Sequence, residues 1–236
     1  MELLNFNVYD RSLEELPMNK EKLIINTINP HSYIVSKSDS NFNKALKNSD
    51  ILLPDGIGIV KAMKLVHRKE IDKIAGADLH EYLLEYVNSN NGTVFYLGAS
   101  QNTLEKIFNK YSNITVRYYS PPYKDKFSLQ DQKIMIDKIN QIKPDVLFLG
   151  MTAPKQEKWL NENKTFIDFK VAASIGAVFD FYAGTVKRPS PFWIDLGLEW
   201  LPRLLKEPKR LWRRNFISTP LFIFDVFKEK LSKKNK

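Results

Sequence analysis

Asp55 has the most suggestive setting for chemistry in this sequence. It ends the apolar run DILLPD (Asp50–Asp55) and precedes Gly56 and Gly58, which allow a ligand or another backbone segment to approach closely. A carboxylate at the end of such a run, beside buried apolar surface, is a candidate general base that takes a proton from a substrate hydroxyl. Asp is also a good N-cap residue for a helix beginning near Gly58. The local sequence leaves both interpretations open.

Other segments rich in Gly, Pro and polar residues also follow apolar runs. In an open parallel sheet, ligands bind beyond the carboxyl ends of the strands, so these loops predict one shared site. The segment Gly98-Ala99-Ser100 opens a helix, whose free N–H groups can hold a phosphate. Each loop taken singly is also what an ordinary turn requires. The five loops are residues 27–30, 54–58, 98–100, 150–157 and 176–180.

Several common chemistries lack the residues that they need. There is no cysteine, which excludes disulfides, a thiol nucleophile and a thiolate zinc site. The three histidines, His31, His67 and His80, do not have the spacing of metal ligands on a helix. The dinucleotide pattern G-x-G-x-x-G, the Walker pattern and a D-x-D triplet are absent, which disfavours NAD, ATP and a metal-held nucleotide diphosphate. A sugar nucleotide bound here would need Lys, Arg or helix N-termini to neutralise its diphosphate.

The elements that position these loops alternate between strand and helix. This alternation, with Gly, Pro and Asn at the boundaries, predicts an α/β fold with a mostly parallel, Rossmann-like sheet flanked by helices. The predicted strands are Lys22–Ile28, Asp50–Asp55, Thr93–Gly98, Ile114–Ser120, Asp145–Gly150 and Lys170–Gly176. The predicted helices are Ser32–Asn48, Gly58–His67, Asp78–Asn88, Gln101–Lys110, Leu129–Ile142 and Pro154–Asn163.

Composition and charge divide the chain in two. The 236 residues, 43% hydrophobic and 27% charged, are typical of a globular protein and exclude a disordered or fibrous one. The net charge is +9, yet residues 185–236 hold 13 basic and 5 acidic side chains and so carry +8 of it. We therefore predict an α/β catalytic body over residues 1–184. Residues 185–236 form a basic C-terminal appendage of amphipathic helices, kinked at Pro202 and Pro208.

The appendage admits three interpretations. Its Lys and Arg residues, interleaved with Trp and Phe, suit an anionic membrane surface. It also suits packing on the body or in a homo-oligomer, or nucleic-acid binding; the amount of apolar surface favours the membrane. No run of about 18 apolar residues and no basic N-terminal signal is present, so we expect a cytoplasmic protein.

At its longest ordered motifs the sequence resembles the WecG/TagA/CpsF glycosyltransferases, glycosyltransferase family 26, over roughly Leu23–Phe216. The motifs are Thr27-x-Asn29-Pro30, LLPDGIGIVKA (Leu52–Ala62), AGADL (Ala75–Leu79), PDVLFLGMTAPKQEKWL (Pro144–Leu160) and GAVFDFYAGTVKRPSPFWIDLGLEWLPRLLKEPKRLWRR (Gly176–Arg214).

The resemblance implies an inverting transfer of an N-acetylmannosamine-type sugar from a UDP donor to an undecaprenyl-diphosphate-linked GlcNAc acceptor. It further implies that no metal or other cofactor is needed and that the protein is peripheral on the inner face of the cell membrane, in cell-wall or surface polysaccharide assembly. Another donor, UDP-N-acetylmannosaminuronic acid or UDP-glucose, is the alternative within the fold. A non-catalytic nucleotide- or nucleic-acid-binding protein is the alternative outside it.

The resemblance also assigns roles to single residues. Asp55 matches the proposed catalytic base, and Thr27 and Asn29 match the polar pair that orients acceptor or donor sugar. Gln156 lies where a donor-contacting amide is expected, and Asp180 where a carboxylate reaches the uridine. Gln156 and Asp180 also have ordinary alternatives, a polar residue in a first helical turn and a helix cap.

The remaining matched residues are cationic. Arg203, Arg210 and Arg213 match appendage arginines that close over the site or contact a diphosphate. Lys73 stands before the GADL segment, at a position where the family commonly has Arg. A Lys at this position retains the positive charge but cannot bind a phosphate in the bidentate geometry of Arg.

Overall fold

A six-stranded parallel sheet forms the centre of the molecule. The structure is a computed structural model and describes residues 1–110, 113–184, 193, 201, 204–205 and 208–234. The strand order is β4-β3-β8-β7-β5-β6, and every pair of neighbours is parallel. The strands are β3 (Leu23–Ile28), β4 (Ile51–Pro54), β5 (Thr93–Gly98), β6 (Thr115–Tyr119), β7 (Val146–Gly150) and β8 (Val171–Ser174). The predicted fold class and all six predicted strands are confirmed.

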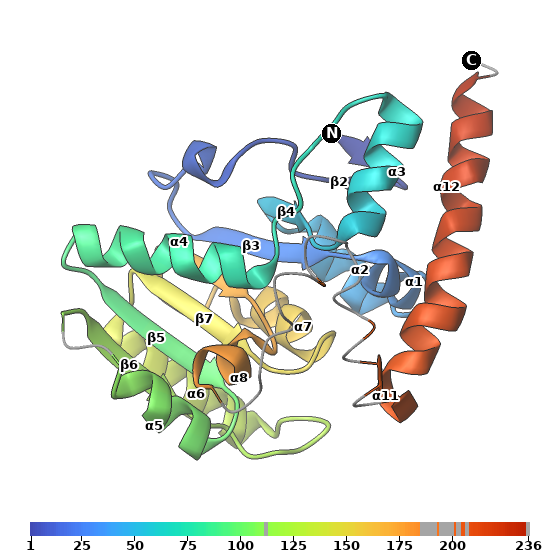
Figure 1. Cartoon of the computed structure of the whole chain (residues 1–236). Coiled ribbons are helices and arrows are strands. Elements are labelled where there is room, and N and C mark those ends of the chain that lie inside the picture. The colour runs from blue at the N-terminus through green and yellow to red at the C-terminus, as the bar shows by residue number, and fades with distance from the viewer. Residues whose placement is uncertain (111–112, 185–192, 194–200, 202–203, 206–207, 235–236) are drawn as a thin grey trace.

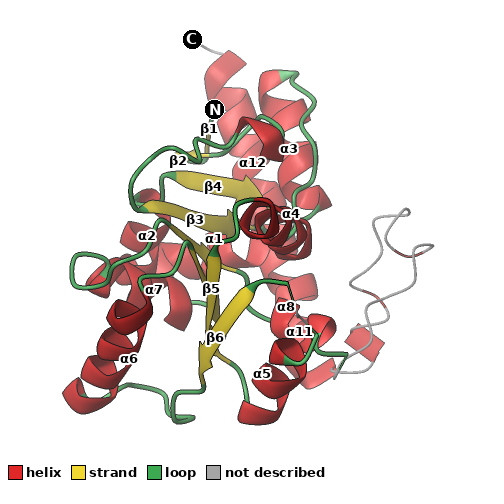
Figure 2. Cartoon of the chain, turned by 90° about the vertical axis from the view of Figure 1, so that its left-hand side faces the viewer, coloured by secondary structure: helices red, strands yellow, loops and turns green. Residues whose placement is uncertain are grey.

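The helices cover both faces of this sheet (Figures 1 and 2). One face packs against α4, α5 and α8, and the other against α6 and α7, with α1, α2, α3 and α12 around β3 and β4. A small hairpin of β1 (Glu2–Leu3) and β2 (Phe6–Asn7) joins the second group. The helices are η1 (Leu13–Glu15), α1 (Pro30–Ser38), α2 (Ser40–Lys47), α3 (Ile57–His67), α4 (Gly76–Ser89), α5 (Gln101–Phe108), α6 (Leu129–Ile142), α7 (Lys155–Asn163), α8 (Val178–Tyr182), α11 (Pro208–Arg213) and α12 (Thr219–Lys234).

The central strands are apolar almost throughout because helices cover both of their sides. Tyr96 of β5 and Phe148 of β7 are fully buried, and their rings lie 5.3 Å apart between centroids. This burial explains why runs such as TVFYLG and DVLFLG lack the polar alternation of a half-exposed strand.

One predicted helix, Ser32–Asn48, is two helices in the structure. Asp39 ends α1 and begins α2: its N–H donates to the carbonyl of Val35, and its side chain accepts from the N–H of Phe42. A side chain that caps the second helix stabilises the break, which helical periodicity alone does not reveal.

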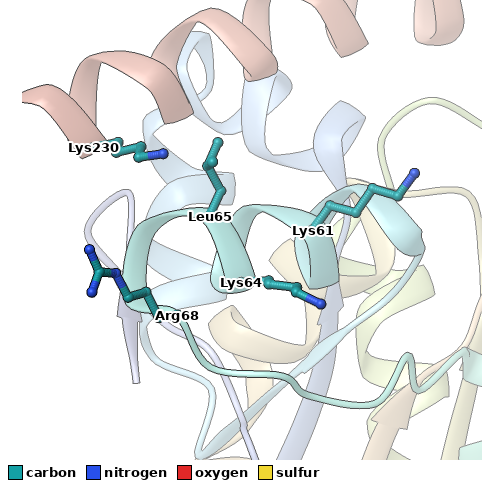
Figure 3. A pocket seen from close by; sticks show the side chains of 5 residues that line it. All are labelled: Lys61, Lys64, Leu65, Arg68 and Lys230. Carbon is teal, nitrogen blue, oxygen red and sulfur yellow. The ribbon is translucent and has the colours of Figure 1, made fainter.

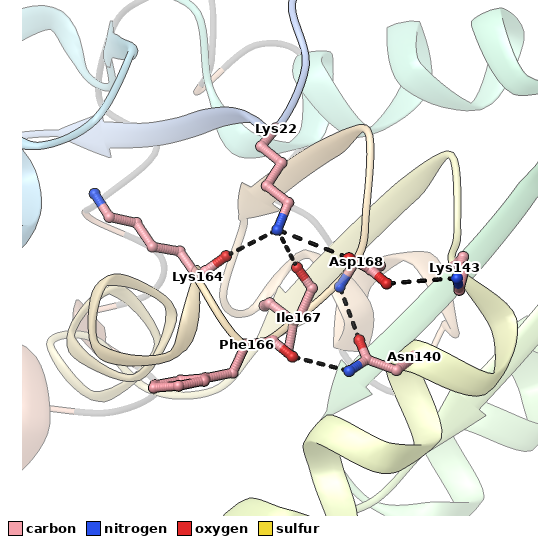
Figure 4. Close-up of polar contacts among 7 residues, drawn as sticks. All are labelled: Lys22, Asn140, Lys143, Lys164, Phe166, Ile167 and Asp168. Carbon is pink, nitrogen blue, oxygen red and sulfur yellow. Dashed lines mark hydrogen bonds and ion pairs between the residues drawn. The ribbon is translucent and has the colours of Figure 1, made fainter.

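A cluster of polar contacts lies at the amino-terminal ends of the strands (Figure 4). Lys22 donates to the carbonyl of Ile167 at 2.9 Å and forms an ion pair with Asp168. Asn140, near the end of α6, donates to the carbonyl of Phe166 and accepts from the N–H of Asp168, both at 2.8 Å. These bonds fasten the loop between α7 and β8, so this edge has a structural role.

The described part of the predicted appendage packs on the body. Helix α12 lies along α1 and α3 (Figure 1) and buries Phe222 and Val226 in the same core as the N-terminal hairpin. Asp225 accepts from the hydroxyl of Tyr33 at 3.0 Å and forms an ion pair with Lys37. Among the described residues, no helix is long and apolar enough to cross a membrane. Of the two prolines predicted to kink the appendage, Pro208 is the first residue of α11 and Pro202 lies outside the described residues. The predicted boundary between body and appendage at residue 184 stays a prediction.

Candidate active site

The chain leaves the carboxyl ends of β3 and β8 toward opposite faces of the sheet. Strand β3 leads into α1 on one face, whereas its neighbour β8 leads into α8 on the other. The two connections diverge at this point, which is where open α/β sheets bind ligands. Of the predicted site residues, Thr27, Asn29 and Asp55 lie at the ends of β3 and β4 on one side of this point, and Gln156 and Asp180 follow β7 and β8 on the other.

Asp55 is held by the side chain of Asn29, which caps α1. The side-chain oxygen of Asn29, Oδ1, accepts hydrogen bonds from the backbone N–H groups of His31 and Ser32 at 3.1 and 3.0 Å. With its oxygen committed in this way, the amide turns its nitrogen to Asp55 and donates to Oδ2 at 3.3 Å. A carboxylate and the amide that holds it are thus contributed by the segments that follow two neighbouring strands, β3 and β4.

Asp55 does not cap α3. The N-cap position is Gly56, with a φ of +95° that favours glycine, and it makes no side-chain capping bond. The N-cap interpretation of Asp55 is therefore wrong. The half-buried carboxylate belongs to a turn that continues the sheet, since its N–H donates to the carbonyl of Ile28 at 2.9 Å. Thr27 is half-buried in β3 and pairs in register with Leu53, two residues before Asp55.

The segment between α3 and α4 places Lys73 near the end of β4. The N–H of Ile74 donates to the carbonyl of Pro54 at 3.1 Å, so half-buried Lys73 lies beside the end of β4. Helix α4 then begins at Gly76, where a Cβ atom would stand 3.3 Å from the carbonyl oxygen of Ile175. The segment that leads into the AGADL motif thus runs from the end of β4 to the end of β8.

Gln156 is buried in the first turn of α7 and is only 3% exposed. Its Oε1 accepts from the N–H of Met151 at 3.1 Å, and its Nε2 donates to Glu157 Oε1 at 2.9 Å. A Cβ atom on Gly176 would stand 3.8 Å from Nε2, so the amide lies at the end of β8 as well. These two hydrogen bonds fix the orientation of the amide. Gln156 is thus a buried residue, unlike the usual solvent-exposed polar residue in a first helical turn.

Glu157 is a buried carboxyl group that the sequence analysis missed. It is 3% exposed, and burial raises its pKa to about 7. Its Oε2 atom is buried without a hydrogen-bond partner. Nothing in the sequence distinguishes Glu157 from an acidic residue in an exposed first turn, where the helix dipole favours it.

Asp180 belongs to a second part of the site, at the end of β5. Its Oδ1 accepts from the hydroxyl of Thr103 at 3.3 Å, which in turn lies 3.0 Å from the hydroxyl of Ser100. Ser100 caps α5 and accepts from the N–H of Thr103. Strands β8 and β7 separate β3 from β5, so the two parts are about 14 Å apart at a strand spacing of about 4.8 Å. The site is therefore elongated, with one carboxylate at each end.

The predicted arginines are only partly described. Arg203 and the side chain of Arg210 lie outside the described residues, and Arg213 ends α11 with its side chain exposed. The sequence did not single out the next residue, Arg214. Burial, and to a lesser extent the charge of Arg214, lowers the pKa of His31. His31 Nδ1 lies 2.9 Å from the hydroxyl of Ser218. The five-residue π-helical turn at 214–218 therefore brings Arg214 to the start of α1, close to Asn29.

The histidines do not assemble a metal site in the part of the chain that is described, where no group of three His, Cys, Asp or Glu residues could hold an ion. His80 is a core residue: its Nε2 lies 2.8 Å from the hydroxyl of Tyr96, and burial lowers its pKa to about 3. It is uncharged at neutral pH.

Comparison with known proteins agrees with this architecture. A family model described as "Glycosyl transferase WecG/TagA/CpsF family" matches residues 2–236. The chain is 32% identical over 215 residues to the N-acetylglucosaminyldiphosphoundecaprenol N-acetyl-beta-D-mannosaminyltransferase of Bacillus subtilis (strain 168), covering 89% of this chain and 81% of that protein. Proteins of the same name match from Bacillus spizizenii, at 34% over 217 residues (90% and 81%), and from Staphylococcus aureus (strain MW2), at 28% over 212 residues (88% and 81%).

Proposed function

This chain belongs to the WecG/TagA/CpsF family of glycosyl transferases, and we propose that it transfers N-acetylmannosamine from UDP to N-acetylglucosaminyl-diphospho-undecaprenol. The enzyme is a glycosyltransferase of cell-wall polysaccharide synthesis, and its acceptor is a lipid-linked GlcNAc. The observation that carries the mechanism is the contact between Asp55 and the amide of Asn29 at the paired ends of β3 and β4.

Asp55 acts as the general base in this proposal. The acceptor hydroxyl oxygen attacks C1 of the donor sugar, and its proton passes to the Asp55 carboxylate. The bond between C1 and the β-phosphate oxygen breaks, and UDP departs with the electron pair from the opposite face, which inverts the configuration at C1. The Asn29 amide holds one carboxylate oxygen, so the base is oriented before the acceptor arrives.

The donor lies along the carboxyl ends of β3, β8, β7 and β5. Its nucleoside lies at the Asp180 end, beside the N-terminus of α5, and its sugar lies at the Asp55 end. Lys73 and Arg214 lie on either side of the part of the site that contains Asp55, and their positive charges stabilise the departing diphosphate. These side chains take the role that a metal ion has in other transferases. Gln156, with both ends of its amide bonded, keeps the floor between the two ends in place.

The test is UDP release from UDP-N-acetylmannosamine, with a GlcNAc-diphosphate-lipid analogue as acceptor and EDTA present. Asp55→Asn retains the size of the side chain and an oxygen for Asn29, but removes the base, so we expect turnover to fall by about 10²–10⁴-fold. Asp137→Asn, on an exposed face of α6, is the matched control and should leave turnover unchanged.

Two results would contradict the proposal. Wild-type turnover by Asp55→Asn would exclude Asp55 as the base. Turnover that EDTA abolishes and a divalent cation restores would show that a metal ion neutralises the diphosphate. UDP release with UDP-glucose or UDP-N-acetylmannosaminuronic acid alone would retain the reaction class and replace the donor.

A further inference from the structure

The hydrogen bond between Gln156 and Glu157 links a residue of the proposed donor site to a buried carboxyl group. Gln156 Oε1 accepts from the N–H of Met151 at 3.1 Å, and its Nε2 donates to Glu157 Oε1 at 2.9 Å. A primary amide has two N–H groups, and in the described part of the chain only one of those of Gln156 meets a protein acceptor. The second N–H of Gln156 can therefore bind a ligand.

The amide of Gln156 lies at the carboxyl end of β8, beside Gly176. A Cβ atom on Gly176 would stand 3.8 Å from Nε2 and 4.0 Å from Oε1, so no side chain separates this glycine from the amide. Its φ of +56° favours glycine over residues with a larger side chain. Strand β8 lies between β3 and β5, so the amide lies along the path proposed for the donor, whose phosphate and hydroxyl oxygens accept hydrogen bonds.

Helix α7 and the strand face beneath it contain polar groups that are incompletely paired. Asn26 of β3 and Ser174 of β8, both 1% exposed, follow the last pair in the register of these strands and so stand next to each other. Two residues earlier, each strand carries a side chain that packs with Trp159 of α7, so Asn26 and Ser174 face this helix as well. The buried side-chain atoms without a hydrogen-bond partner in the described part of the chain are Asn26 Oδ1, Glu157 Oε2, Trp159 Nε1 and Ser174 Oγ. Such atoms cost stability, which indicates that this layer has a role other than stability.

Exposed polar clusters in this protein carry no such cost. The pocket between α3 and α12 is lined by Lys61, Lys64, Arg68 and Lys230 around Leu65 (Figure 3). All four cationic side chains are exposed, so water satisfies their hydrogen bonds. Burial, and not polarity alone, therefore sets the layer beneath α7 apart.

We propose that Glu157 is a positioning residue of the transfer reaction: it accepts one N–H of Gln156 and so holds the other toward the donor. Hydrogen bonds at both ends of the amide fix its plane, whereas the bond to Met151 alone would let the amide turn. Oε1 accepts a hydrogen bond whether or not Oε2 carries a proton, so Glu157 holds the amide on both sides of its pKa, which burial raises to about 7. The proposal rests on the proposed function, which places the donor beside Gln156.

The experiment measures kcat and the KM for UDP-N-acetylmannosamine with the GlcNAc-diphosphate-lipid analogue as acceptor. Glu157→Met retains the length of the side chain and removes the acceptor of the Gln156 N–H. One hydrogen bond to the donor accounts for about tenfold in affinity, so we expect KM to rise on the order of tenfold. The bond is present before and during the reaction, so kcat should change by less than about twofold. Glu157→Gln keeps an acceptor oxygen and should restore KM to within about twofold of the wild type.

A double-mutant cycle tests whether Glu157 acts through Gln156. Gln156→Met removes the amide and should also raise KM on the order of tenfold. Without this amide Glu157 has nothing to hold, so the variant with both substitutions should have the KM of Gln156→Met alone. The matched control is Glu162→Met, at an exposed carboxylate of the same helix, which should leave both kcat and KM unchanged.

Two further measurements separate this role from folding. Thermal unfolding shows which variants are folded; if Glu157→Met is not, Glu157→Asp takes its place, because it withdraws the carboxyl group by one methylene and should raise KM similarly. The side-chain ¹⁵N–H resonances of Gln156, identified by their loss in Gln156→Met, report on the amide without substrate. They should shift and exchange faster with solvent in Glu157→Met, and stay close to those of the wild type in Glu157→Gln.

A wild-type KM in Glu157→Met would overturn the proposal. So would additive increases of KM in the double variant, or a Glu157→Gln that loses as much as Glu157→Met. A lower kcat at unchanged KM would show that Glu157 only maintains the fold. Failure of the proposed function has a different signature: no UDP-sugar is turned over, while the Gln156 resonances still depend on Glu157. That result would reject the role in sugar transfer and retain only the contact.

Discussion

Replacing the buried Glu157 with Gln should change how the stability of this enzyme depends on pH. Glu157 lies in the first turn of α7, with one oxygen bonded to Gln156 and the other without a partner. Its pKa is raised from 4.5 to about 7 because burial penalises the charged form. Gln retains an oxygen for Gln156 and cannot ionise, so it imitates the protonated carboxyl group.

The size of the effect follows from the two pKa values. Between pH 4.5 and 7 the unfolded chain releases a proton that the folded chain retains, so the free energy of unfolding falls as pH rises. Below pH 4.5 both states are protonated and the folded protein has its full stability. A difference of about 2.5 pKa units corresponds to about 3 kcal/mol, fully lost by about pH 8.

The assay is urea unfolding of the wild type and of Glu157→Gln at intervals from pH 4 to pH 8. The free energy of unfolding of the variant, relative to that of the wild type, should rise by about 3 kcal/mol across this range. Glu162→Gln, which alters an exposed carboxylate of the same helix, should show no such rise. Parallel curves for the wild type and Glu157→Gln would refute the assignment of Glu157 as a carboxyl group kept neutral by burial.

Three further predictions concern the packing that supports the site. Gly150→Ala would place a Cβ atom 2.3 Å from the ring of Phe179, so we expect urea unfolding to show a loss of about 3 kcal/mol, and Phe179→Ala to cost less in its presence than alone. His80 should stay neutral in the folded chain at pH 5 but gain a proton in the unfolded chain. Acidification from neutral pH to pH 5 should therefore lower the free energy of unfolding of the wild type by about 2 kcal/mol relative to that of His80→Gln. Equal acid sensitivity of the two proteins would contradict this. Asp225→Ala removes the acceptor of the Tyr33 hydroxyl and should weaken the docking of α12 by about 1–2 kcal/mol, seen as earlier proteolysis of α12 with the rest of the chain resistant.

Removal of the C-terminal segment would not isolate the role of the exposed side of α12, because the two sides of this helix lie in different surroundings. Phe222 and Val226 are buried in the core shared with α1 and α3, whereas Phe224 and Phe227 are exposed. A truncated chain would lose the exposed apolar side chains of α12 and uncover this core at once. Substitutions confined to the exposed side separate the two effects.

The sequence by itself determined the strands, the parallel sheet and the position of Asp55 at a strand end. These features are encoded locally: a strand buried on both faces requires a continuous apolar run, and such a run ends where polar and Gly residues begin. The motifs that carry the family resemblance are likewise local, which is why the sequence alone points to Asp55 and Asn29.

Only the tertiary structure decided which of these residues meet. The order β4-β3-β8-β7-β5-β6 puts Asn29 against Asp55 and separates both from Asp180, and strand order depends on the packing of helices far apart in the sequence. Burial also depends on neighbours, so the sequence did not reveal the buried Glu157 and its raised pKa. For the same reason the two sides of α12, one in the core and one exposed, became distinguishable only when the helix was placed against α1 and α3.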